Sequence, residues 1–312
     1  MKTSVVMATY NGASYLREQL DSIRDQTCKA DEVIFCDDGS KDDTIQILND
    51  YIAENQLGDT WRVVVNDRNL GYANNFHKAM QLAQGEYIFF SDQDDICFPQ
   101  KIQEMVKILE ESHQIQLLCS DYEPFTSAEH APTVPKKILK KMKNDGSVEP
   151  IMLNARNIHI ASLGCVMCIR KTFRDRIDPY WISGWAHDDY VWKTAQCVDG
   201  CYVYHRPLIK RRLHDKNVSM HKMHQKEIRV KFLSELAEAN EAMLSFAKSV
   251  GLKKSKVHFI ERTVKAAHLR TELVDKCKLV NSIKLIGYMD CYHSLKSVLM
   301  EPYIALKYKS AR

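Results

Sequence analysis

Short apolar runs alternate with longer amphipathic stretches through the first 120 residues of the chain. The runs are four or five residues long and rich in β-branched and aromatic side chains, whereas the stretches between them repeat apolar residues every three or four positions. We expect strands at residues 4–8, 32–36, 62–65, 87–90 and 116–119, and helices at residues 14–24, 44–54, 73–83 and 100–112. The alternation predicts an α/β fold with a mostly parallel sheet flanked by helices.

A cluster of polar residues follows each of the first four predicted strands. The clusters are Thr9-Tyr10-Asn11-Gly12, Asp37-Asp38-Gly39-Ser40, Asn66-Asp67-Arg68-Asn69 and Ser91-Asp92-Gln93-Asp94-Asp95. Ligands of open parallel sheets bind beyond the carboxyl ends of the strands. We therefore expect all four clusters to meet in one crevice.

The fourth cluster places three carboxylates within four residues, directly behind an apolar strand. Crowded like charges repel one another and raise one another's proton affinity, and a bound cation relieves this repulsion. An Asp-x-Asp pair here, formed by Asp92 and Asp94, thus indicates a site for a hard divalent ion and the phosphates that it carries. The alternative is a solvated acidic turn before the next helix, which would be the better interpretation of an isolated Asp-x-Asp.

The second half of the chain has a different pattern. Residues 126–150 are rich in Lys and Pro and predict a mobile surface loop, and strands are expected at 161–170 and, as a pair, around 200–213. A helix should begin near residues 185–190, and the pattern is almost wholly helical from residue 221. We place a catalytic domain at residues 1–220, with halves 1–120 and 121–220, and a helical region at residues 221–312.

The composition is that of a soluble globular protein. Of the 312 residues, 45% are hydrophobic and 27% charged, no apolar run approaches the roughly 20 residues that span a bilayer, and the start lacks a signal-peptide pattern. We expect a cytoplasmic or peripherally membrane-bound protein. The ten cysteines are scattered, and the one C-x-x-C pair, Cys165 and Cys168, lies in an apolar run, which favours core residues over a redox or zinc role.

The quoted motifs resemble those of the family 2 glycosyltransferases of the GT-A fold. The matching stretches are Ala8-Thr9-Tyr10-Asn11, Asp37-Asp38-Gly39-Ser40, Asn69-Leu70-Gly71-Tyr72 with Asn75, and Ser91-Asp92-Gln93-Asp94-Asp95. The resemblance covers about residues 3–220 and is nearest to the rhamnosyltransferase-like group that makes bacterial surface polysaccharides. That group usually has Trp where this chain has Cys97, so the donor sugar does not follow from the resemblance.

The resemblance implies roles for residues around the crevice. It assigns Asp92 to the nucleotide, close to the ion, and Asp94 to Mg²⁺ or Mn²⁺. The nucleotide-sugar would be held further by Thr9, Tyr10, Asn11, Asp38, Arg68 and Asn75. A divalent ion on the diphosphate would stabilise the charge that develops on the leaving phosphate.

A general base is implied at the start of the helix about 90 residues after the Asp-x-Asp motif. His187-Asp188-Asp189 stands there, and we take Asp188 as the base with Asp189 second. Either Asp alone fits equally well as a helix cap or first-turn acid. The group also carries an Arg-x-x-His-x-x-Asn-Val stretch, which Arg211 to Val218 resembles. Arg211 would then neutralise phosphate charge, and His214 would bind the ion or the diphosphate.

The resemblance implies an inverting, metal-dependent glycosyltransferase. Such an enzyme would move a hexose or deoxyhexose, with UDP-galactose and dTDP-L-rhamnose as leading donors, to a hydroxyl of a lipid-linked glycan of the undecaprenyl diphosphate type. The products would be bacterial O-antigen, capsule or cell-wall polysaccharide. Two alternatives remain: a sugar nucleotidyltransferase, although the Gly-rich triphosphate loop expected near the N-terminus is missing, and an inert nucleotide-sugar-binding scaffold.

The C-terminal region is strongly basic. Residues 221–312 hold 18 Lys and Arg against 9 Asp and Glu, whereas the whole chain has a net charge of only +4. Lysines interleaved with apolar residues suit helices that lie on the anionic inner face of the cytoplasmic membrane. A helical bundle that packs on the catalytic domain or forms a homodimer fits equally well, and nothing beyond charge supports nucleic-acid binding.

Overall fold

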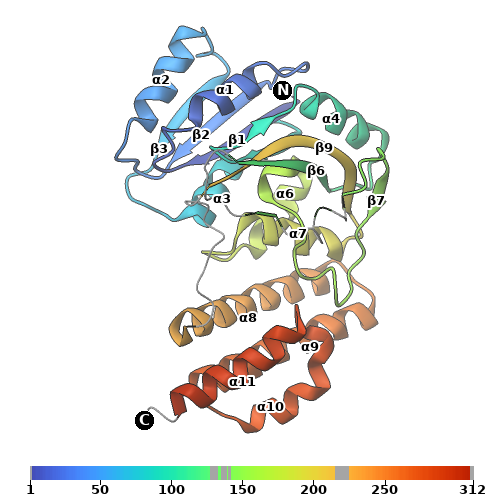
Figure 1. Cartoon of the computed structure of the whole chain (residues 1–312). Coiled ribbons are helices and arrows are strands. Elements are labelled where there is room, and N and C mark those ends of the chain that lie inside the picture. The colour runs from blue at the N-terminus through green and yellow to red at the C-terminus, as the bar shows by residue number, and fades with distance from the viewer. Residues whose placement is uncertain (1, 127–132, 135–138, 140–141, 215–224, 310–312) are drawn as a thin grey trace.

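The computed structural model describes residues 2–126, 133–134, 139, 142–214 and 225–309. Figure 1 shows a sheet covered by helices at one end of the molecule and a layered group of helices at the other. Residues 127–132, 135–138 and 140–141 of the expected mobile loop, and the boundary expected near residue 220, lie outside the described residues.

The described residues form a sheet of nine strands, in the order β3-β2-β1-β4-β8-β6-β9-β5, with β7 paired to β9. The strands are β1 (Thr3–Thr9), β2 (Glu32–Asp37), β3 (Trp61–Val65), β4 (Tyr87–Ser91), β5 (Ile96–Cys97), β6 (Leu117–Thr126), β7 (Val148–Pro150), β8 (Met167–Arg170) and β9 (Cys201–Leu213). Strands β1 to β4 are mutually parallel, as predicted, and the antiparallel β8 joins them to the parallel pair of β6 and β9.

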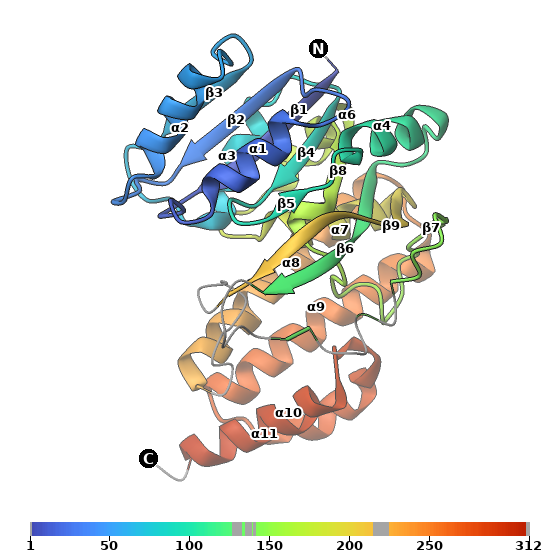
Figure 2. The same ribbon diagram turned by 45° about the horizontal axis from the view of Figure 1, so that its top comes forward.

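Helices cover both faces of the sheet. They are α1 (Leu16–Arg24), α2 (Thr44–Glu54), α3 (Tyr72–Leu82), α4 (Lys101–Glu111), α6 (Lys171–Ile177) and α7 (His187–Cys197). Figures 1 and 2 place α1, α2 and α4 on one face and α3, α6 and α7 on the other. Because both faces are covered, every position of β2 and β4 is buried, which explains why these strands are almost continuously apolar.

Two predictions for the second half of the sheet were wrong in detail. The pair of strands expected around residues 200–213 is one 13-residue strand, β9. Pro207 lies opposite Asp121 where the register between β6 and β9 shifts, and such an irregularity tolerates the missing backbone donor. The strand expected at 161–170 is confined to β8, because a 3-10 turn, η1 (Gly164–Val166), precedes it.

The C-terminal region is helical, as predicted. It comprises α8 (Lys226–Ser249), α9 (Lys254–Asp275), α10 (Val280–Lys284), the 3-10 segment η3 (Leu285–Cys291) and α11 (Leu295–Lys309). The carboxylate of Glu301 in α11 is fully buried between the guanidinium groups of Arg229 and Arg270. No helix among the described residues combines the length and the apolar character that a bilayer crossing requires.

All ten cysteines are free, and all except Cys28 are buried. This confirms their expected place in the core.

Candidate active site

The four polar clusters meet at one edge of the sheet, as predicted. Strands β3, β2, β1 and β4 are parallel neighbours in that order, so their carboxyl ends open on the same side. The register pairs Thr9 with Asp37, Asp37 with Val65, and Met7 with Ser91.

The turn after β1 joins two of the other clusters. The Thr9 hydroxyl is buried and donates to Asp37 Oδ2 at 2.9 Å, while the Asn11 side chain accepts from the backbone of Lys41 at 2.8 Å. The Tyr10 backbone exchanges two hydrogen bonds with the Gln93 side chain, and its own side chain is 48% exposed. The Tyr10 side chain is therefore available to a ligand in the crevice, whereas the buried Thr9 hydroxyl is bonded to Asp37.

Asp38 organises the loop between β3 and α3. Its buried carboxylate accepts hydrogen bonds from Asn66 Nδ2, Leu70 N and Gly71 N at 2.7–2.9 Å. Gly71 has φ 79°, a conformation in which a side chain would be strained, and α3 begins immediately after it. Asp38 thus fixes the wall of the crevice, and both of its oxygens already have partners.

Asn75 and Arg68 lie in contrasting positions on the same wall. The Asn75 amide is buried, donates to Cys36 O at 2.7 Å and accepts from Asn66 at 2.8 Å. Arg68 is exposed. Of this pair, Arg68 has the side chain that a phosphate or nucleoside can reach.

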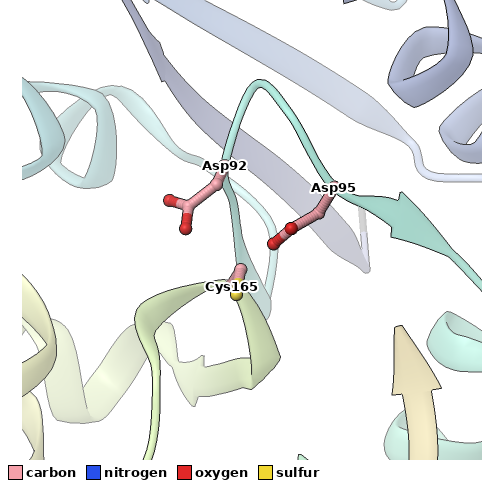
Figure 3. Close-up of side chains that lie close together, drawn as sticks. All are labelled: Asp92, Asp95 and Cys165. Carbon is pink, nitrogen blue, oxygen red and sulfur yellow. The ribbon is translucent and has the colours of Figure 1, made fainter. Parts of the chain in front are cut away.

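The acidic turn after β4 is fastened on both sides. Gln19 Nε2 in α1 donates to Ser91 Oγ and to Asp92 O. On the other side, Asp95 Oδ1 accepts from the Arg212 backbone N–H at 2.9 Å. Figure 3 shows Asp92 and Asp95 on this turn above Cys165 of η1, and ligand atoms of the three residues lie within 4.8 Å of one another.

Burial, together with the crowding of carboxylates, dominates the electrostatics of this turn. Burial and the charges of Asp95, Asp94 and Asp188 raise the pKa of Asp92 well above its ordinary value, and Arg211 opposes them. Burial and Asp94 raise the pKa of Asp95 to about 6, and its Oδ2 accepts no hydrogen bond from the residues that the structure describes, although Asp95 is only 2% exposed. A cation would relieve this repulsion, so the turn fits the predicted ion.

Asp94 and His214 come together across 120 residues of sequence. Asp94 Oδ2 lies 2.7 Å from His214 Nε2, and the imidazole stacks on Tyr15 with ring centroids 4.9 Å apart. A carboxylate oxygen and an imidazole nitrogen are both ligands that Mn²⁺ accepts. The two predicted ligands are therefore adjacent, and a divalent ion would be held by Asp94 and His214 with Asp92 beside them.

The two neighbouring arginines of β9 have different environments. Arg211, which the sequence singled out, lies over the Tyr122 ring, and its charge lowers the proton affinity of Asp92 and Asp95. Arg212 is buried between the Tyr15 and Phe125 rings. The sequence reading missed Arg212, whose Nε donates to Asp94 O at 2.9 Å and which thereby fixes the acidic turn.

Asp188 and Asp189 occupy the first turn of α7. Asp189 Oδ2 accepts from Trp185 Nε1 and from Lys193 Nζ, both at 2.8 Å. Asp188 Oδ1 accepts from the Asp189 backbone N–H at 2.8 Å, and this half-buried carboxylate forms no other hydrogen bond with the described residues. Burial and Asp189 raise the pKa of Asp188 to about 6.

His187 sets the position of this turn by packing. Its ring stacks on Phe76 with centroids 3.8 Å apart and contacts Phe90, and neither ring nitrogen forms a hydrogen bond within the described part of the chain. Burial lowers the pKa of His187 to about 3, so the ring is neutral at pH 7. A Cβ at Gly164 would stand 2.2 Å from His187 Nε2, so glycine is required where η1 passes the ring.

The comparisons with known proteins agree with this fold. The family model described as "Glycosyl transferase family 2" matches residues 4–176. An uncharacterized glycosyltransferase of Rickettsia typhi is 29% identical over 229 residues, which are 72% of this chain and 68% of that protein. One of Methanocaldococcus jannaschii is 36% identical over 121 residues, which are 38% of this chain and 40% of that protein.

Solved structures share the fold at low sequence identity. The chain resembles Staphylococcus aureus TarS 1–349 in complex with UDP-GlcNAc, with 18% identity, a TM-score of 0.62, and coverage of 100% of this chain and 93% of that one. It also resembles the mannosyltransferase PcManGT of Pyrobaculum calidifontis, in complex with GDP-Man and Mn²⁺, with 16% identity, a TM-score of 0.55, and coverage of 99% and 87%. The chain belongs to glycosyltransferase family 2, and its fold is of the GT-A type.

Proposed function

We propose that this family 2 glycosyltransferase is inverting and metal-dependent, with catalysis in residues 1–220. It moves a hexose or deoxyhexose from a nucleoside-diphosphate sugar to a hydroxyl of a lipid-linked glycan. The structural neighbours bound to UDP-GlcNAc and to GDP-Man support a nucleotide-sugar donor. The donors we propose are UDP-galactose and dTDP-L-rhamnose.

We assign the reaction to the assembly of O-antigen, capsule or cell-wall polysaccharide in bacteria. The acceptor in such assembly is carried on a lipid of the undecaprenyl diphosphate type. The proposed enzyme accordingly works in the cytoplasm, at the inner face of the cytoplasmic membrane.

The observation that carries the proposal is that a carboxylate suited to act as a base lies near a carboxylate turn suited to bind a cation. Asp92 and Asp94 stand on a crowded turn that suits a cation, and Asp188 enters the same electrostatic environment from α7. Asp188 has a pKa of about 6, so it is largely ionised at pH 7 and still basic enough to accept a proton. A general base and an ion site in one crevice are the two parts that sugar transfer requires.

In the proposed step, Asp188 accepts the proton of the acceptor hydroxyl as that oxygen forms a bond to the anomeric carbon. The bond from this carbon to the β-phosphate oxygen breaks, and its electron pair leaves with the nucleoside diphosphate. One displacement inverts the anomeric configuration. The divalent ion, when bound, supplies Lewis-acid stabilisation of the leaving phosphate.

Other side chains of the crevice prepare the donor for this step. Tyr10 and Arg68 are exposed at the rim, where they can contact the nucleoside and the phosphates. Arg211 brings a guanidinium beside Asp92, where it can offset the charge of the diphosphate.

The test is product analysis with a panel of UDP-, dTDP- and GDP-sugars and a lipid-linked acceptor, with Mn²⁺ and with EDTA. We expect one nucleotide class to yield free nucleoside diphosphate and an inverted glycoside, and EDTA to abolish the reaction. Asp94→Ala and His214→Ala should each raise the Mn²⁺ concentration required, because each removes an ion ligand. Both variants should unfold at a temperature close to that of the wild type in EDTA.

Each alternative gives a different product pattern. A sugar nucleotidyltransferase would release or consume pyrophosphate. A scaffold would bind the donor, seen as a thermal shift that rises with ligand concentration, and never consume it. Either result would contradict the proposed function.

A further inference from the structure

One face of α11 exposes a continuous apolar stripe. Leu295, Leu299, Tyr303 and Leu306 are all more than half exposed, and Leu299 reaches 75%. Their spacing of four, four and three residues places them on one side of the helix. The opposite side carries the buried Ile304 and Ala305, so the apolar stripe is additional to the face that packs in the fold.

A second stripe runs along α10 and η3. Val280, Ile283, Ile286 and Met289 recur every third residue, and Ile283 and Ile286 are 70% and 69% exposed. A 3-10 helix has three residues per turn, which favours one side for residues at this spacing, although η3 is kinked at Tyr288 between Ile286 and Met289.

Both stripes face away from the rest of the molecule. Leu285 of η3 and Ala305 of α11 pack with Ala266 and Leu273 of α9 in one buried cluster, and the stripes lie on the outer sides of the same elements. Figures 1 and 2 place α10 and α11 beyond α8 and α9 as seen from the sheet.

Exposed apolar side chains are concentrated in the two stripes. Eight of the fifteen large apolar side chains that are exposed among the described residues belong to these two stripes. Single exposed apolar residues are normal on a protein surface, whereas exposed apolar residues that recur along one side of an element, as in each stripe, mark a binding surface.

The charges around the stripes are lysines. Lys284 and Lys296 are exposed beside them, and Lys276 and Lys278 stand just before them, where Glu272 pairs with both. Between residues 276 and 309 the chain has two acids. Glu301 is buried between its arginines, and Asp290 pairs with Arg262 at 2.7 Å.

We propose that α10, η3 and α11 form a membrane-docking surface that lies in the headgroup region of a bilayer containing anionic lipid. The apolar stripes would enter the boundary between headgroups and acyl chains, and the lysines would contact lipid phosphates. A second copy of the chain is a poorer occupant, because a two-fold interface on this face would bring like-charged lysines together. The inference rests on the proposed function in one respect: membrane docking would bring that enzyme to its lipid-linked acceptor.

The test is co-sedimentation of the full chain with vesicles of phosphatidylcholine alone and of phosphatidylcholine with phosphatidylglycerol. The wild type should bind the anionic vesicles, and less at high salt, because exposed charges are screened. Leu295→Glu/Leu299→Glu and Lys284→Glu/Lys296→Glu should each weaken binding about tenfold or more. Val148→Glu, which changes an exposed apolar residue of β7, is the matched control and should bind like the wild type.

Thermal unfolding establishes that each variant is folded, and light scattering measures the oligomeric state. If the wild type does not bind anionic vesicles, or if the stripe variants bind them as well as the wild type does, the proposal of a docking surface is contradicted. A dimer that dissociates in Leu295→Glu/Leu299→Glu, with no vesicle binding, would identify a second copy as the occupant and overturn it as well.

The donor assay is independent of the vesicle assay. All the surface variants should keep the wild-type thermal shift with Mn²⁺ and nucleotide-sugar. If the chain binds vesicles but turns over no donor, the proposed function is contradicted and the docking surface is still supported.

Discussion

Asp188 and Asp189 are adjacent at the start of α7, yet their carboxylates have different partners. Asp189 accepts a hydrogen bond from Trp185 and pairs with Lys193, whereas Asp188 accepts one backbone hydrogen bond from the described residues. A general base must have an oxygen lone pair directed at its substrate. At the scale of the residue, this difference favours Asp188 as the base and makes Asp189 a positioning residue.

Substitution of the two acids should separate these roles. Asp188→Asn should lower kcat about 10²–10⁴-fold with donor binding unchanged, since general-base catalysis contributes about that much. Asp189→Asn should lower the unfolding temperature, because it weakens the ties of α7 to Trp185 and Lys193. Steady-state kinetics, donor thermal shifts and thermal unfolding of both variants measure these effects, and equal kcat losses in the two would contradict the assignment.

The pH dependence follows from the raised pKa of Asp188. The base must be ionised, so activity is retained above this pKa of about 6 and is lost as the pH falls through it. We expect kcat to decrease about tenfold per pH unit below that value. A pH–rate profile with product quantitation measures this decrease at acidic pH. Constant activity from pH 7 down to pH 5 would exclude Asp188 as the base.

At the scale of the element, β9 connects the two halves of the site. It pairs with β5, directly after the acidic turn, and with β6 along most of its length. Its final residues bring Arg212 to the backbone of Asp94 and continue into His214. A single long strand thus links the acceptor half of the sheet to the ion site.

Helix α11 is held by a buried ionic group rather than by apolar contacts alone. Glu301 is fully buried and is bonded to Arg229 of α8 and Arg270 of α9, so it joins three helices. Removing one member of a buried ion pair leaves an uncompensated charge in a dry environment. The cost should exceed that of any surface pair in the same region.

We expect Glu301→Ala to lower the free energy of unfolding by about 3–5 kcal/mol, since two arginines would remain buried without a counter-charge. Glu241→Ala removes an exposed pair with His268 and should change it by less than about 1 kcal/mol. Urea unfolding followed by circular dichroism compares the two variants. Similar stabilities would mean that the buried group does not hold α11.

At the scale of the whole molecule, the crevice and the proposed docking surface lie on different elements. The crevice lies at the carboxyl ends of β1 to β4, and α10 and α11, which carry apolar stripes, lie beyond α8 and α9 as seen from the sheet. Separation allows the outer helices to carry exposed apolar residues without disturbing the charged crevice. The design fits an enzyme whose acceptor is carried by a lipid.

The sequence alone determined the parallel half of the sheet and the meeting of the four polar clusters. Both follow from local information: the periodicity of apolar residues defines strands and helices, and parallel strands connected in series must end on one side. For the same reason the Asp-x-Asp turn, the start of α7 and the helical C-terminal region were predictable.

The tertiary structure decided what depends on distant partners. The contact of Asp94 with His214 and the placement of Arg212 rather than Arg211 against the acidic turn both require residues far apart in sequence to meet. The same holds for the single strand β9, whose Pro207 is accommodated only because β6 shifts register beside it. Local pattern fixes which elements form, and packing fixes which of their side chains stay available for chemistry.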